Sequence, residues 1–296
     1  MTSSVSSARA PVPAGFKPPR TTLHTTRVLP GFKSSLSLTI TYLSLIVLIP
    51  LAALVARPWE HGLQGFLFNL TDPRVIASLK LTFGVAAAAA LLNLFVGLII
   101  AWVLTRYSFP GRRLLDALVD LPFALPTAVA GIALCTLYAP NGWIGALFDP
   151  LGIKIAYTPI GIFVALVFVG LPFVVRSVQP VLAEFDAEVE EAAQTLGASP
   201  LQTAVRVIFP SLAPALLSGF SLALARAVGE YGSVIFIAGN MPYVSEITPL
   251  LIVIKLQEFD YAGAASVALI MLGMSFAVLV VLNALQLWLS RQGGRS

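Results

Sequence analysis

Apolar residues fall into six long runs along the chain, separated by shorter stretches that hold most of the charged residues. Each run is about 20 residues or longer, the length that a helix needs to cross the hydrocarbon core of a bilayer. None of the runs shows the strict alternation of a membrane β-strand. We therefore predict six transmembrane helices. They lie near residues 36–56, 75–105, 121–139, 159–178, 212–238 and 262–289.

Composition supports an all-α, polytopic membrane protein. The chain has 296 residues, of which 57% are hydrophobic and 11% are charged, and its mean hydropathy is +0.89. A soluble domain has about 25% charged residues, so a water-soluble globule is excluded. The single cysteine, Cys135, excludes an internal disulfide and suits a packing residue. With His24 and His61 in predicted loops, we expect no metal site.

The N-terminal residues 1–33 are rich in Ser, Thr and Pro and contain basic residues but no acidic ones. This composition predicts a disordered basic tail. A cleaved signal peptide is the alternative, because small residues follow at the end of the first apolar run. That run is longer than the usual apolar core of a signal peptide, and the polar leader before it is too long.

Basic residues mark one side of the predicted membrane domain. They concentrate in the tail and in every second loop, whereas the loops on the opposite side hold only Arg57, Arg74, Lys154 and Lys255. The positive-inside rule then predicts that both termini and residues 184–210 are cytoplasmic. The predicted divisions are a tail at 1–33, a membrane domain at 36–290 and a short cytoplasmic tail at 291–296. Because the positive charge follows membrane topology, we expect no nucleic-acid partner.

Residues 184–210 form a charged segment that cannot lie in hydrocarbon. Its first part predicts a helix that ends near Gly197, a suitable residue just beyond a helix C-terminus. One face would carry the apolar residues Leu182, Phe185, Val189, Ala192 and Leu196. Another face would carry Glu184, Glu188 and Glu191, and the segment also holds Asp186 and Glu190.

A second helix is predicted directly after Gly197. Ser199 suits the N-cap, Pro200 the first helical position, and Gln202 completes a capping box. Its apolar stripe would consist of Leu201, Ala204 or Val205, and Ile208, with Pro210 ending this helix or beginning the next span. A solvated linker is the alternative, but a linker needs neither two apolar stripes nor a defined turn.

The sequence Glu191-Ala192-Ala193, followed after three residues by Gly197, resembles the cytoplasmic motif of binding-protein-dependent ABC importer permeases. Val207 and Phe209-Pro210 stand where that motif has isoleucine and Leu-Pro, and both differences keep an apolar character. The resemblance implies a type I ABC importer permease fold. It also implies that residues 184–210 contain a coupling helix that docks on an ATP-hydrolysing subunit. The implied docking residues are Glu190, Glu191, Ala192, Ala193, Leu196, Gly197, Ser199 and Pro200.

Residues 121–134, 138–145, 170–182 and 225–240 resemble the T-type permease subunit of sulfate/thiosulfate importers. This resemblance implies a W-type permease partner, a dimer of ATP-binding subunits and a periplasmic sulfate- or thiosulfate-binding protein. It places the chain in a bacterial or plastid-type inner membrane. ATP and Mg²⁺ would bind the ATPase, and this chain would bind no cofactor. A molybdate permease is the alternative within this class.

Other classes of function have weaker support. The chain contains no G-x-x-x-x-G-K-[ST] phosphate loop, so we expect it not to hydrolyse ATP. A proton-coupled transporter would need intramembrane acids, and Glu230 alone is thin support. For an intramembrane enzyme, the chain would need a Ser/His, Cys/His or paired-carboxylate centre, and its sequence shows none. On the outer side, acidic residues outnumber basic ones, so we expect a binding protein to deliver a dianion.

Charges inside the predicted fifth span mark a candidate translocation path. Arg226 and Glu230 are four residues apart and would share a helix face, with Gly229 and Gly232 beside the acid. One interpretation places Arg226, Glu230, Tyr231 and Ser233 along the path or its gate. The other is an ion pair that only neutralises two buried charges. For Asn93, in the second span, we expect a helix–helix hydrogen bond rather than a substrate contact.

Overall fold

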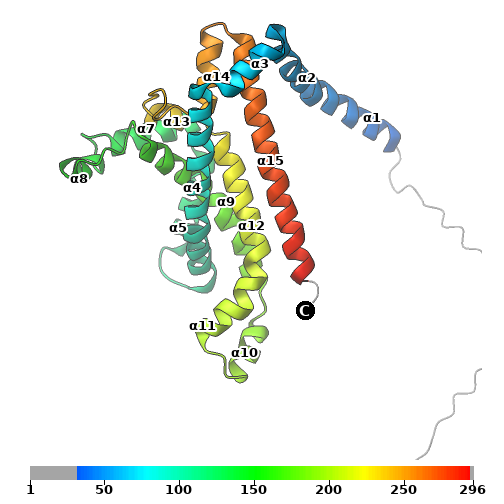
Figure 1. Cartoon of the computed structure of the whole chain (residues 1–296). Coiled ribbons are helices and arrows are strands. Elements are labelled where there is room, and N and C mark those ends of the chain that lie inside the picture. Colours follow the sequence, from blue (N-terminus) through cyan, green and yellow to red (C-terminus); the bar gives the residue numbers. More distant parts are fainter. Residues whose placement is uncertain (1–31, 294–296) are drawn as a thin grey trace, which may run out of the picture. The chain divides into compact units, whose positions relative to one another are not determined.

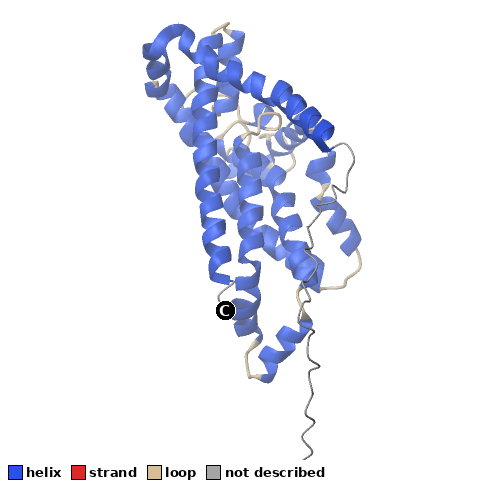
Figure 2. Cartoon of the chain, turned by 90° about the vertical axis from the view of Figure 1, so that its right-hand side faces the viewer, coloured by secondary structure: helices blue, strands red, loops and turns tan. Residues whose placement is uncertain are grey.

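A computed structural model describes residues 32–293, and all regular secondary structure in that range is helical (Figures 1 and 2). The chain divides into two units, one ending at Pro50 and the other beginning at Leu51. The predicted basic tail lies outside the described residues except for its last two positions, and so does the end of the predicted C-terminal tail. The first residues of that C-terminal tail continue the last helix.

The described part of the first unit consists of α1 (Phe32–Leu43), the π-helical turn η1 (Ser44–Leu48) and the start of α2 (Ile49–Ala56). These elements belong to a candidate membrane span of 29 residues, Phe32–Glu60, which confirms the first predicted span and lengthens it. The π turn directly precedes Ile49-Pro50. Proline has no N–H to donate and crowds the carbonyl four residues earlier, so a wider turn accommodates it.

The second unit begins within α2 and contains the other helices. They are η2 (Arg57–His61), α3 (Gly62–Thr71), α4 (Pro73–Arg106), α5 (Arg112–Val119), α6 (Leu121–Ala124), α7 (Thr127–Tyr138), α8 (Gly145–Phe148), η3 (Asp149–Leu151), α9 (Pro159–Glu184), α10 (Ala187–Thr195), α11 (Pro200–Thr203), η4 (Ala204–Ile208), α12 (Phe209–Val228), α13 (Val234–Ile237), α14 (Thr248–Gln257) and α15 (Tyr261–Gly293). Five helices in the described range are long and apolar enough to cross a membrane.

Helices α4, α9 and α12 pack against one another and form the core of the second unit, and α15 runs beside α12 (Figure 1). Glycines allow the close approach. A Cβ atom at Gly97 of α4 would lie 2.8 Å from a methyl of Val174 in α9, and one at Gly219 of α12 would lie 2.9 Å from the Cα atom of Val174. Small residues at such contacts are typical of helix packing in membranes.

The third predicted span, residues 121–139, is wrong as a single helix. It is divided into α6 and α7, and α7 has only 12 residues, too few to cross a bilayer alone. The break lies at Leu125-Pro126, where Leu125 is extended with φ −85° and ψ 132°. Proline disfavours helical backbone in the preceding residue, which explains the position of the break.

The fifth predicted span, residues 212–238, is wrong at both ends. The helix begins earlier, because α11, η4 and α12 form one candidate span, Pro200–Val228. It ends at Val228, and residues 229–233 form a loop before the short helix α13. Two glycines weaken the helix in this stretch, and the buried carboxylate of Glu230 in the loop accepts a hydrogen bond from the N–H of Ser233, just before α13.

Two short helices that the hydropathy pattern did not predict, α3 and α14, lie at the end of the unit where α4 begins (Figure 1). Arg74 of α4 pairs with the buried carboxylate of Glu246, just before α14, through contacts of 2.7 and 2.8 Å. The hydroxyl of Thr82 accepts a 2.8 Å hydrogen bond from the backbone N–H of Thr248. These contacts hold the start of α14 against α4.

Candidate functional site

The charged segment folds as a helix, a tight turn and a second helix, but its first helix starts later than predicted. Phe185 is extended, and Asp186 is the N-cap of α10, accepting a 3.0 Å hydrogen bond from the N–H of Glu188. Leu182 and Glu184 therefore belong to α9, and Leu182 is buried in the core. The predicted stripe that began at Leu182 is wrong, because an Asx cap interrupts the helical periodicity.

The turn agrees with the prediction in detail. Gly197 has φ +85°, and its N–H donates to the carbonyl of Gln194 at 2.9 Å. The N–H of Ala198 donates to the carbonyl of Ala193 at 3.0 Å, which completes a Schellman motif. Ser199 and Gln202 then form a reciprocal capping box, with Pro200 at the first position of α11. The direction of α11 relative to α10 is therefore set by local hydrogen bonds.

The second helix does not stop at Pro210. The helix passes from α11 through the π turn η4 into α12, and Pro210 is the second residue of α12. This repeats the arrangement at Pro50, with a π turn before each proline. The segment after the turn is thus the first part of a membrane-spanning helix, so a displacement of α11 is applied directly to α12.

Apolar side chains on this segment point away from the rest of the unit. Leu196 is 88% exposed and Leu201 73% exposed, and Val189 and Val205 are also exposed. Ile208 is buried, so the predicted second stripe is divided between surface and core. An exposed cluster of large apolar residues next to acidic ones is typical of a protein-docking surface. We call Val189, Leu196, Leu201 and Val205 the apolar patch.

Most of the predicted docking residues lie beside the apolar patch. Ala193 is half-buried, and the exposed ones are Glu191, Ala192, Gly197, Ser199 and Pro200. Glu190 differs, because its carboxylate accepts a 2.5 Å hydrogen bond from Arg106 at the end of α4. No local sequence pattern could have predicted this pairing, since 84 positions separate Arg106 from Glu190.

A second group of charges joins α5 and α6 to α9. Arg176 donates to Asp120 at 2.6 and 2.8 Å and to Asp116 at 2.8 Å. Gln179, one turn further along α9, donates to Asp116 at 3.1 Å. The hydrogen bonds from Gln179 and Arg176 lower the pKa of Asp116 below its ordinary value. The carboxylate therefore stays ionised, and the pairing fixes α5 against α9.

The loop at 229–233 brings the predicted path residues together. Arg226, in the last turn of α12, forms an ion pair with Glu230, as the spacing predicted. Glu230 nevertheless lies beyond the end of the helix and is only 2% exposed. Its other carboxylate oxygen accepts hydrogen bonds from the N–H of Ser233 at 2.9 Å and from the Ser233 hydroxyl at 3.0 Å. Tyr231 packs against the core.

Helix α7 supports this loop by direct backbone contact. A Cβ atom at Gly131 would lie 2.4 Å from the carbonyl oxygen of Ser233, and one at Gly232 would lie 2.2 Å from the hydroxyl of Thr127. The side chain of Arg226 is 34% exposed, whereas that of Glu230 is buried. The arrangement places the partly exposed side chain of Arg226 beside a loop that packs closely on α7.

Asn93 has the structural role that the sequence suggested. Its side-chain amide donates to the carbonyl of Val167 in α9 at 3.1 Å, and the residue is fully buried. The hydrogen bond joins α4 to α9 in the core, which confirms the prediction of a helix–helix contact.

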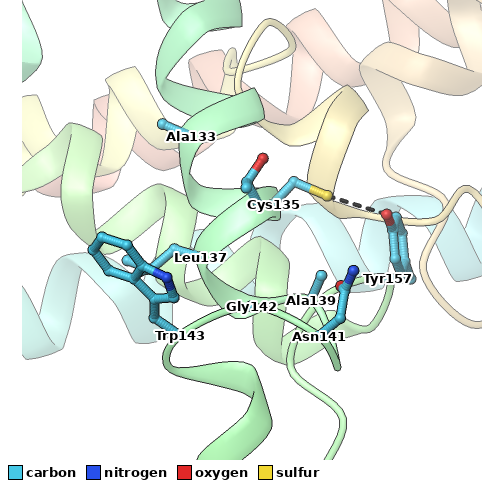
Figure 3. Close-up of a pocket in the computed structure, with 9 residues that line it drawn as sticks. Ala133, Cys135, Leu137, Ala139, Asn141, Gly142, Trp143 and Tyr157 are labelled. Atoms are coloured by element: carbon cyan, nitrogen blue, oxygen red, sulfur yellow. Dashed lines mark hydrogen bonds between the residues drawn. The ribbon is translucent and has the colours of Figure 1, made fainter.

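A cavity of about 590 Å³ lies at the end of α7 and the turn that follows it (Figure 3). The thiol of Cys135 donates to the hydroxyl of Tyr157 at 3.3 Å on one side, and Trp143 lies on the other (Figure 3). The residues that line it do not include Arg226, Glu230, Tyr231 or Ser233. The predicted path residues and this cavity are therefore separate features.

Comparison with known proteins gave consistent matches. The family described as "Binding-protein-dependent transport system inner membrane component" matches residues 93–292. A sulfate transport system permease protein, CysT, of Salmonella typhimurium is 49% identical over 269 residues, covering 91% of this chain and 96% of that protein. The protein of the same name from Synechocystis is 49% identical over 250 residues, covering 84% of this chain and 87% of that protein.

Solved structures show the same fold at low sequence identity. A chain of a bacterial ABC transporter involved in the import of the acidic polysaccharide alginate has a TM-score of 0.73 and 15% identity. The match covers 86% of this chain and 94% of that chain. The fold is therefore that of an ABC importer permease, as the sequence resemblance implied.

Proposed function

Because the chain belongs to the family of binding-protein-dependent transport system inner membrane components, we propose that it is a membrane-spanning permease subunit of an ATP-driven importer for sulfate or thiosulfate. The observation that supports sulfate as the substrate is the 49% identity, over 91% of this chain, to a sulfate transport system permease protein. The stretches that resemble the T-type sulfate permease, at both ends of α7 and around the loop at 229–233, support the same substrate.

The proposed complex has further subunits. A dimer of ATP-binding subunits would carry ATP and Mg²⁺ and dock on α10 and α11, the coupling segment, through the apolar patch and its neighbours from Glu190 to Pro200. A W-type permease would complete the membrane channel. This chain lacks the phosphate-binding loop that an ATPase needs, so hydrolysis is assigned to the partner.

A periplasmic binding protein would deliver the substrate. The outer loops of the predicted topology carry more acidic than basic residues, and Arg74 is already neutralised by Glu246. This surface offers little attraction for a sulfate dianion arriving from solution. In this proposal both termini lie in the cytoplasm, and the chain lies in an inner membrane, as the family description states for its members.

Arg226, Glu230, Tyr231 and Ser233 would form part of the translocation path or its gate. Glu230 is buried and is held by the N-terminus of α13, whereas Arg226 has an accessible side. Glu230 offsets the charge of Arg226, so the pair would give a weak anion contact rather than a tight site. A weak contact suits transport, because the substrate must also leave.

The test is uptake of labelled sulfate by a strain that lacks its own transporter and expresses this chain with its partner subunits. We expect uptake that requires the ATPase, competition by thiosulfate and little competition by molybdate. Stronger competition by molybdate would favour a molybdate permease. Uptake that follows the proton gradient and survives loss of the ATPase would refute the proposal in favour of a secondary transporter.

The path assignment is tested in the same strain. Arg226→Leu is expected to reduce uptake, since it removes the accessible cation and leaves Glu230 buried without its partner. Arg226→Leu/Glu230→Leu removes both charges and should stay impaired if the cation contacts substrate. Full uptake by the double variant, at equal membrane levels, would instead assign the pair a structural role only.

A further inference from the structure

Arg106, the last residue of α4, contacts α10, the connection between α9 and α10, and an aromatic ring of its own helix. Its Nη2 donates to Oε1 of Glu190 in α10 at 2.5 Å. Its Cζ lies 5.7 Å from the ring centre of Trp102 in α4 and 6.0 Å from that of Phe185, which separates α9 from α10. Two aromatic rings therefore hold the guanidinium in place while it binds the coupling segment.

Partial burial strengthens this ion pair. The side chains of Arg106 and Glu190 are 24% and 25% exposed, so water screens their charges less than at a free surface. Within the described residues, the buried Nε–H of Arg106 has no acceptor. A carboxylate can accept from an arginine through both of its oxygens, so a small movement of α10 can tighten the contact.

The backbone connection between α9 and α10 constrains α10 less than this side-chain contact does. Phe185 and Asp186 are extended, and they join α9 to α10 without helical hydrogen bonds between the two helices. At its other end α10 meets α11 through the Schellman turn, and α11 continues into α12. Movement of α10 is thus carried to α12 along the backbone, whereas transfer to α4 needs a side-chain link.

We propose that Arg106 is a positioning residue that links the coupling segment to α4, so that α10 and the cytoplasmic end of α4 move together. This inference rests on the proposed function, in which α10 docks on the ATPase. The link would divide the motion of one docked helix between two core helices, α12 through the backbone and α4 through the ion pair. Loss of the link should uncouple ATP hydrolysis from transport while the apolar patch of the docking surface stays intact.

The experiment uses the complete transporter in proteoliposomes with its binding protein, and measures ATP hydrolysis and substrate uptake in the same vesicles. The variants are Arg106→Gln, Glu190→Gln and the exchange Arg106→Glu/Glu190→Arg. Glu188→Gln, which removes an exposed acid from the same helix, is the matched control. We expect uptake per ATP to fall roughly 2- to 30-fold in both single variants, to recover largely in the exchange, and to stay unchanged in the control.

Two results would overturn the inference. Single variants that match Glu188→Gln would show that the ion pair carries no coupling. Single variants that lose coupling without recovery in the exchange would assign the loss to something other than this pairing. If Arg106→Gln does not assemble, Glu190→Gln and the exchange still decide, because assembled ATPase is quantified for each.

The outcome is separable from that of the proposed function. A wild-type complex that assembles but imports neither sulfate nor thiosulfate would refute the substrate assignment. The ratio of uptake to hydrolysis would then be compared for the oxyanion that the complex does import. The role of Arg106 is decided by the difference in uptake per ATP between the variants and the Glu188→Gln control, whichever substrate is used.

Discussion

At the residue scale, charged side chains in this chain are organised into pairs that bridge helices. Glu230 is buried and pairs with Arg226, and Arg176 pairs with Asp116 of α5 and with Asp120, which lies between α5 and α6. An uncompensated buried charge costs several kcal/mol, so pairing explains how a chain with few charged residues can keep them in or beside membrane spans. The pairs of Arg106 and Arg176 also connect elements that are far apart in the sequence.

The close contact between Gly131 and Ser233 predicts the effect of adding one methyl group at position 131. Gly131→Ala would place a Cβ atom 2.4 Å from the carbonyl oxygen of Ser233, and backbone cannot move aside cheaply. We expect reduced uptake and a loss of about 1–3 kcal/mol of stability, as is usual for overpacking. Uptake at equal membrane levels and thermal unfolding of the purified complex measure the two effects.

Gly84→Ala is the control for that substitution. Gly84 also lies in a helix, but no atom lies within 4 Å of a Cβ built there. Alanine favours helix more than glycine by roughly 1 kcal/mol, so this variant should be neutral or slightly stabilised. Equal behaviour of the two variants would show that the α7 contact does not hold the loop.

At the element scale, three prolines mark places where long apolar runs depart from regular α-helix. Pro50 and Pro210 are each preceded by a five-residue π turn and the helix continues, whereas Pro126 follows an extended residue and the helix is interrupted. A π turn absorbs the missing hydrogen bond within the helix, while a break exposes backbone that needs other partners. The break before α7 lies where that helix packs against α13.

The turn between α10 and α11 gives a prediction about coupling. Gly197 has φ +85° and open space around it, so a side chain there is opposed by backbone strain rather than by collision. Gly197→Val should cost about 1–2 kcal/mol locally and change the angle between the two helices. We expect a lower ratio of uptake to ATP hydrolysis, measured in proteoliposomes.

Gly111→Val is the control that separates an effect on coupling from a general effect of backbone strain. Gly111 has φ +87° and equally open surroundings, but it lies in the connection before α5. The same substitution imposes similar strain outside the coupling segment, so the transport ratio should be preserved. A similar loss of coupling in both variants would contradict a special role for the turn at Gly197.

At the scale of the whole molecule, the apolar helices and the charged segment define two sides of a membrane protein. The described part of the chain holds five helices that can span, and α7 contributes a shorter apolar helix. The positive-inside rule assigns the α5 and α10–α11 ends to the cytoplasm and the turn after α7 to the outside. The proposed docking segment and the proposed entry side then lie on opposite faces, as import driven by a cytoplasmic ATPase requires.

This topology can be tested by labelling single cysteines, because the chain has only one of its own. In a Cys135→Ala background, Asn141→Cys should react with a membrane-impermeant maleimide on intact spheroplasts. Arg113→Cys, at a position that is also exposed, should react only after the membrane is opened. The reverse labelling pattern would show the opposite orientation, in which the coupling segment lies outside the cytoplasm and cannot meet a cytoplasmic ATPase.

Local signals in the sequence were sufficient for the membrane class, the approximate spans, and the turn from Gly197 to Gln202. Hydropathy, a glycine that adopts positive φ and a capping box act through neighbouring residues, so they can be recognised without a fold. The ion pair of Arg226 and Glu230 was predictable for the same reason, since four residues separate its members.

Only the tertiary structure decided which distant groups meet and where the third and fifth spans break. Arg106 and Glu190 are 84 positions apart, and Arg176 and Asp116 are 60 apart, so no periodicity connects them. The loop that follows the early end of α12 is held by the hydrogen bonds of Ser233 to the buried carboxylate of Glu230 and by the close contact with α7. These features arise when packed helices place polar groups within reach of one another, because burial makes an unpaired polar group costly.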